Sequence, residues 1–169
     1  MSPTRSARRL ALVALVSLCS AATAQAQNNA TANITAAVQQ PITVTKNNDL
    51  AFGNVFPGVD KTIAVTAAGA AKFTVAGQAA TPVQLTFSLP GTLTNGGNNL
   101  VIDTWTGHHN TVDLATGGTS FTPSSSATTA TLSAVGGNLF VYVGATVRPT
   151  TSQAAGNYTG SFTMTAVYF

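Results

Sequence analysis

The carboxyl-terminal stretch, residues 156–169, alternates apolar and polar side chains with a period of two. One parity carries glycine, aromatic and apolar residues, and the other carries Asn, Thr and Ser as far as Thr165. This period is typical of a β-strand with one buried face, so the pattern predicts a strand from Tyr158 to the chain end. Such a strand is about twice the usual five or six residues. Because terminal segments fray unless something binds them, we also expect a pairing partner, in the same chain or in another.

The amino-terminal stretch has the features of a secretory signal peptide. Three arginines precede an apolar run over residues 10–18, and Ala24-Gln25-Ala26 fits an A-x-A cleavage site. The run is too short for a transmembrane helix. A lipoprotein signal ending at Cys19 is an alternative, although Leu18 stands where a small residue is expected. Removal of residues 1–26 leaves 169 − 26 = 143 residues, and we expect export through the inner membrane and the periplasm to the cell surface or the medium.

The expected mature chain, unlike the whole chain, carries no net charge. The whole chain has a formal charge of +3, but all three excess cations are arginines of the signal peptide. Four cations then face four aspartates: Lys46, Lys61, Lys72 and Arg148 against Asp49, Asp60, Asp103 and Asp113. This balance gives no support to a nucleic-acid partner. The single Cys leaves with the signal peptide, so no disulfide or thiol chemistry is expected.

Residues 27–40 form a second alternating segment. Small and apolar residues at Ala32, Ile34, Ala36 and Val38 alternate with mostly polar neighbours, and Pro41 then interrupts the pattern. We therefore divide the mature chain into an amino-terminal extension, residues 27–40, and a β-domain, residues 41–169.

The β-domain reads as many short strands separated by turns. Short alternating runs recur, and Asn95-Gly96-Gly97-Asn98-Asn99 is a strong hairpin signal. Residues 107–126 have the composition of a loop, and no window shows the apolar period of a helix. These features predict an all-β protein with an antiparallel sandwich or barrel.

Candidate residues for chemistry are few. His108 and His109 are adjacent, so on a strand they would point to opposite faces; we expect an exposed polar loop and no metal site. The chain has no Glu, no nucleophile motif and no phosphate-binding loop. Trp105 could stack on a sugar ring, but a place in the core is favoured. We expect neither an enzyme nor a cofactor.

The order of several motifs resembles a known family. These motifs are Leu50-Ala51-Phe52-Gly53, Asn95-Gly96-Gly97, residues 135–139, residues 156–163 and the penultimate Tyr168. Together they resemble a family of bacterial secreted pilin-like domains catalogued as a domain of unknown function, DUF4402. The resemblance extends to chaperone–usher fimbrial subunits and spore-coat U domains, to which that family is similar. Pilins likewise end in an alternating strand with a penultimate Tyr and a Gly at the position of Gly156.

The resemblance implies an immunoglobulin-like antiparallel β-sandwich of pilin type that lacks its last strand. A donated strand would fill the gap: first that of a periplasmic chaperone, and then the extension of the next subunit after passage through an outer-membrane usher. The implied donor residues are Ala32, Ile34, Ala36 and Val38. The implied acceptor edge and chaperone-recognition strand comprises Gly156, Tyr158, Phe162, Met164, Ala166, Tyr168 and Phe169.

Two departures from that pattern leave an alternative open. Many pilins carry a disulfide, which this mature chain lacks, and the donor ridge here is mostly Ala. A self-complemented secreted β-sandwich would fold the extension into its own sheet. It could then act as a binding module, for carbohydrate or for surface adhesion.

Overall fold

The computed structural model of the chain describes residues 28–169. The predicted signal peptide, residues 1–26, lies outside this part. The chain divides into two units, residues 1–36 and residues 37–169. No helix long and apolar enough to cross a membrane occurs between residues 28 and 169.

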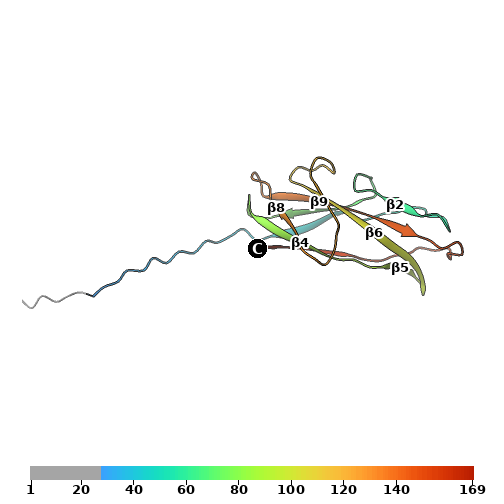
Figure 1. Cartoon of the computed structure of the whole chain (residues 1–169), viewed down its shortest axis with the longest axis horizontal. Coiled ribbons are helices and arrows are strands. Elements are labelled where there is room, and N and C mark those ends of the chain that lie inside the picture. The colour runs from blue at the N-terminus through green and yellow to red at the C-terminus, as the bar shows by residue number, and fades with distance from the viewer. Residues whose placement is uncertain (1–27) are drawn as a thin grey trace, which may run out of the picture. The chain divides into compact units, whose positions relative to one another are not determined.

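Two antiparallel sheets make up the second unit. The larger sheet has the strand order β1 (Thr43–Asn48), β3 (Ala71–Ala76), β9 (Asn138–Arg148), β6 (Asn98–Asn110) and β5 (Thr92–Asn95). Two short strands extend it: β2 (Lys61–Ile63) pairs with β9, and β7 (Thr119–Phe121) pairs with β6. The smaller sheet has the order β10 (Thr163–Tyr168), β4 (Pro82–Ser88) and β8 (Thr128–Thr131). In Figure 1, β4 and β8 lie near the carboxyl terminus, and β5 lies at the opposite end of this unit.

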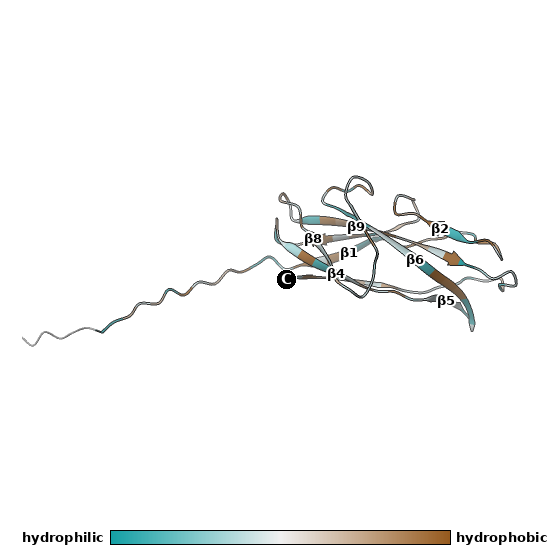
Figure 2. Cartoon of the chain, viewed as in Figure 1, coloured by the Kyte–Doolittle hydropathy of each residue, from teal (hydrophilic) through white to brown (hydrophobic). Residues whose placement is uncertain are grey.

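Alternating apolar residues place the core between the two sheets. β3, β4 and β10 each bury every second side chain, and Figure 2 shows this alternation along β4 as brown between paler bands. Val75 of the larger sheet and Leu85 of the smaller one are fully buried. Residues 28–169 contain strands and no helix, which confirms the all-β prediction for this part of the chain.

The predicted hairpin is confirmed, whereas the predicted loop over residues 107–126 is partly wrong. Gly96 and Gly97 join β5 to β6, and both have positive φ angles, as a tight hairpin turn requires. β6, however, continues to Asn110 and then pairs with β7. The polar composition of this stretch is typical of a loop. It forms a strand nevertheless, because its backbone is paired on both sides, to β9 and to β7.

The two alternating segments that flank the domain are less regular than the sequence predicts. The last strand covers only Thr163–Tyr168, and Thr159 forms an isolated bridge with Thr94. Residues 28–42 have no strand assignment. Alternation alone does not make a strand, because a strand also needs a neighbour for its backbone groups.

Candidate functional site

A groove of about 820 Å³ lies between two irregular segments of the β-domain. One wall is residues 48–57, which follow β1, and the other is residues 153–162, which precede β10. Ligand pockets in proteins span roughly 300–1,000 Å³, so the groove is large enough for a specific occupant. Because β1 leads into the groove and β10 leads out of it, the two strands run in opposite directions.

The floor of the groove is apolar. It consists of side chains from β6 and β9 of the larger sheet and of aromatic side chains. Leu100 and Ile102 of β6 and Val147 of β9 are buried there. The half-buried Trp105 packs on Phe162, with ring centroids 5.4 Å apart, and Phe162 also meets Phe73 edge-on at 5.6 Å. The floor therefore offers hydrophobic and aromatic contact rather than charge.

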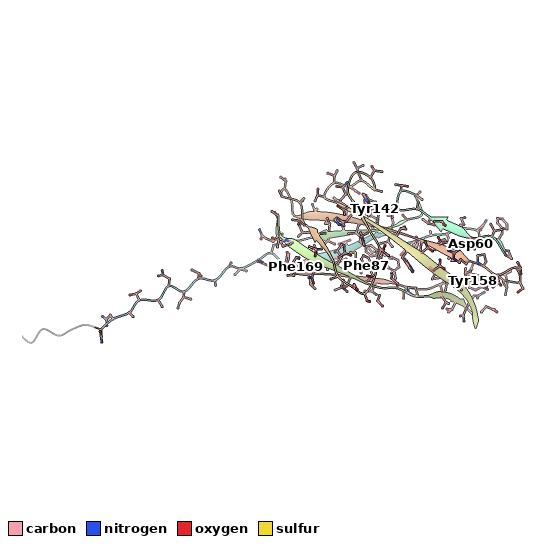
Figure 3. The ribbon with its side chains drawn as sticks, viewed as in Figure 1. Asp60, Phe87, Tyr142, Tyr158 and Phe169 are labelled. Carbon is pink, nitrogen blue, oxygen red and sulfur yellow. The ribbon has the colours of Figure 1, made fainter. Side chains whose placement is uncertain are left out.

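The wall formed by residues 153–162 is held by hydrogen bonds and by two glycines. Thr159 and Thr94 exchange backbone hydrogen bonds of 2.8 and 3.0 Å. Tyr158 donates from its hydroxyl group to the carbonyl of Ala154 at 2.8 Å. Gly156 has a φ angle of +151°, and a Cβ there would collide with the side chain of Asn95. This wall is thus fixed against β5. In Figure 3, Tyr158 lies at the end of the domain where Figure 1 labels β5.

The opposite wall is held by fewer bonds. The backbone N–H of Ala51 donates to Gly69 O at 2.9 Å, and Lys61 Nζ donates to Asn54 O at 2.8 Å. Apart from Asn48, the last residue of β1, neither wall lies in a strand, so much of the backbone along the groove is not paired in a ladder.

The last strand continues the second wall and has one free edge. β10 pairs with β4 on one side, and no strand of residues 28–169 pairs with its other side. β10 also approaches β1, the edge strand of the larger sheet. An unpaired edge of this kind is a template for an added strand.

The predicted acceptor residues fall into three groups. Gly156, Tyr158 and Phe162 line the groove. Met164 and Ala166 point into the core from β10, and Tyr168 is half-buried at its end. Phe169 is 62% exposed, lies on the other parity and makes no part of the groove wall.

Tyr168 forms a junction between three segments. Its hydroxyl group accepts a hydrogen bond of 2.6 Å from the backbone N–H of Gln78 and donates one of 2.8 Å to Gln40 O. Gly77 makes this approach possible, because a Cβ at that position would collide with the hydroxyl oxygen. The end of β10 is therefore attached to the residue that precedes Pro41.

The predicted donor residues are Ala32, Ile34, Ala36 and Val38, and all four are exposed. Ile34 is 96% exposed and Val38 is 97% exposed. Large apolar side chains with this exposure contribute no hydrophobic stabilisation in the isolated chain, and their burial against a partner would stabilise the complex.

The histidine pair does not occupy the exposed loop that we predicted. Both residues lie on β6; His108 is buried and accepts a 3.3 Å hydrogen bond from Gly118 N–H through Nε2. His109 packs on Phe121, and burial, followed by the nearby charge of His108, lowers the pKa of His109. No cluster of three or more His, Cys, Asp or Glu side chains that could hold a metal occurs among residues 28–169.

Lys46 and Asp49 pair at the rim of the groove, and two further networks of charged groups lie on the surface. Arg148 binds Asp103 through Nε and contacts Asp60, and this pairing lowers the pKa of Asp103. Lys72 binds Asp113, and this hydrogen bond lowers the pKa of the Asp113 carboxyl group. The same carboxyl group accepts a hydrogen bond from the hydroxyl group of Tyr142. These pairs join loops to the larger sheet.

The sequence did not indicate that Trp105, Leu100 and Ile102 form a groove floor. Trp105 was expected in the core, and of the residues that line the groove only residues 50–53 and residues of the last stretch were singled out, from the family resemblance. The alternation of a strand distinguishes its two faces but does not tell whether the inner face is fully covered.

Comparison with known proteins identifies a family without a known role. Residues 42–168 match the family described as "Domain of unknown function (DUF4402)". No curated protein matches the chain.

Proposed function

The chain belongs to the DUF4402 family of domains of unknown function, and we propose that it is a structural subunit of a secreted or cell-surface fimbria-like assembly. The subunits polymerise by β-strand donation, and the two-sheet domain is an incomplete immunoglobulin-like sandwich of pilin type. In this proposal the amino-terminal extension of one subunit completes the domain of the next.

One observation carries this proposal: the free edge of β10 and the apolar groove form a continuous path. The groove wall over residues 153–162 runs directly into β10, which has no strand partner on one side within residues 28–169. A strand added to that edge would place alternate side chains on the groove floor. A small ligand would use the groove but would leave the edge unpaired.

The extension has the length and pattern of such a strand. Residues 30–39 span roughly 33 Å when extended, the same as the ten residues 159–168. Full burial of Ile34 and Val38 would stabilise the assembly by roughly 1.5–3 kcal/mol each. Six to eight backbone hydrogen bonds would add about 0.5–1.5 kcal/mol apiece.

The predicted route and partners follow from the same proposal. A secretory signal would carry the chain through the inner membrane, and a periplasmic chaperone strand would cover the free edge until an outer-membrane usher exchanges it for the next subunit. Covering the edge matters because an exposed one promotes aggregation. We propose like subunits as the permanent partner and no catalytic role.

Size-exclusion chromatography with light scattering tests this function on the chain from residue 27. We expect the parent to form polymers and Ile34→Asp to remain monomeric, because an unpaired charge would have to enter the apolar groove. The side chain is 96% exposed, so the substitution does not disturb the fold of the monomer.

Asn33→Asp is the matched control, because it adds the same charge on the opposite parity of the segment and should polymerise. Deletion of residues 27–39 should also block assembly and leave a domain that needs a partner to stay soluble. If the parent, Ile34→Asp and Asn33→Asp all elute as folded monomers, strand donation is wrong. The self-complemented secreted binding module would then replace it.

A further inference from the structure

The hydrogen bond between Gln40 and Tyr168 affects whether the extension can enter the groove of its own molecule or that of a second copy. β10 starts beside the groove wall at Thr163 and ends at Tyr168. The residue that connects the extension to β1 is therefore held at the end of β10 that lies away from the groove, by the 2.8 Å hydrogen bond between the Tyr168 hydroxyl and Gln40 O.

Entry into the groove of its own molecule would require a sharp reversal of the chain. The extension would have to run along β10 towards Tyr168, turn at residues 40–42 and continue as β1 in the opposite direction. It would then lie parallel to β10. Parallel pairing is slightly less stable per residue than antiparallel pairing.

The residues at this position are poorly suited to a tight turn. The sequence is Gln39-Gln40-Pro41-Ile42, and a two-residue hairpin of the favoured types needs a positive φ angle at its first central position. Pro41 is fixed at a negative φ, and a β-branched residue such as Ile42 disfavours a positive one. Gln40 is also restricted to extended backbone because it precedes a proline.

We propose that the Tyr168–Gln40 contact and Pro41 together direct the extension away from its own groove and into that of a second copy of this chain. The occupant is residues 30–39 of that copy, and it runs antiparallel to β10. Tyr168 thus acts as a positioning residue that selects intermolecular over intramolecular pairing. This inference rests on the proposed strand donation.

A variant with turn-forming residues tests the selection. Gln40→Asn combined with Pro41→Gly places Asn-Gly at the reversal, which is the strongest short hairpin signal. We expect this double variant to lose the polymer peak and to elute as a monomer whose residues 30–39 are protected from hydrogen exchange. Gln40→Ala is the control: it keeps Pro41 and the backbone carbonyl, and should polymerise like the parent.

Tyr168→Phe tests the contact without changing the turn. It removes the hydroxyl group and keeps the ring, so we expect the monomer fraction to rise about two- to twelvefold, the equivalent of one hydrogen bond. Far-UV circular dichroism confirms that each variant is folded.

The outcomes separate the two proposals. If the parent polymerises and Ile34→Asp does not, but the Asn-Gly variant polymerises like the parent, then the selection by Tyr168 and Pro41 is wrong and strand donation stands. An unchanged monomer fraction in Tyr168→Phe overturns the role of the hydroxyl group. A monomeric parent unaffected by Ile34→Asp overturns strand donation itself.

Discussion

Trp105 of β6 packs on Phe162 with ring centroids 5.4 Å apart, and both residues line the groove between residues 48–57 and 153–162. Trp105 is the single tryptophan of the chain. Its fluorescence therefore reports on the groove alone.

We predict that a synthetic peptide of residues 28–40 shifts the emission of Trp105 to shorter wavelength when it binds, because the half-buried indole loses its remaining contact with water. The acceptor in this titration is the Ile34→Asp chain, whose own extension is disabled. A peptide that carries Ile34→Asp is the control and should leave the spectrum unchanged. Equal shifts with both peptides would contradict the groove as the binding site.

Gly156→Ala should destabilise the domain. The φ angle of +151° is unfavourable for any residue with a Cβ, and the added carbon would collide with Asn95. We expect a loss of about 1–3 kcal/mol in the free energy of unfolding, measured by thermal or urea denaturation. Gly91→Ala is the control, since a Cβ there meets no atom within 4 Å. Similar losses in both variants would show that the wall does not depend on the backbone of Gly156.

Stability should decrease as the pH falls below 6.5, the ordinary pKa of histidine. Burial lowers the pKa of His109 in the folded state, so the unfolded chain binds a proton first. The stabilisation is present above the unfolded pKa and is lost as the pH falls through the folded one. His109→Gln should flatten the dependence of the melting temperature between pH 7 and 5. A slope that persists in this variant would assign the effect to another group.

Removal of metal ions should leave the melting temperature unchanged. His108 and His109 are adjacent on β6, so their side chains point to opposite faces and cannot bind one ion together. The measurement is thermal denaturation with and without a chelator. A lower melting temperature with the chelator would point to a site that includes one of these histidines.

The sequence was sufficient to predict strands wherever alternation coincides with a paired neighbour. Val83, Leu85 and Phe87 alternate and form β4, and Gly96-Gly97 forms the hairpin turn. The prediction of an exposed loop was wrong at His108 and His109. Two adjacent polar residues give no alternation of apolar and polar side chains, although they lie on a strand and His108 is buried.

The acceptor residues and a gap beside the last strand were predicted from a resemblance, whereas the floor and the second wall of the groove were not. Tyr158 and Phe162 line it as the pattern of the last strand suggests, but Phe169 does not. A groove is defined by what is missing between residues 48–57 and residues 153–162. These segments lie about a hundred positions apart in the chain, and a local pattern carries no information on that separation.

The position of Gln40 beside Tyr168, with the groove beyond the start of β10, has a consequence for symmetry. On the proposed mechanism each subunit presents its donor at one end of β10 and its acceptor at the other, so the contact between two copies joins unlike surfaces. Such a head-to-tail contact continues from copy to copy unless the rotation between copies closes it into a ring or a reciprocal pair. Where it stays open it generates a filament with polarity, in which one terminal subunit keeps an empty groove and the other keeps an unused extension. Growth and capping would then require different partners at the two ends.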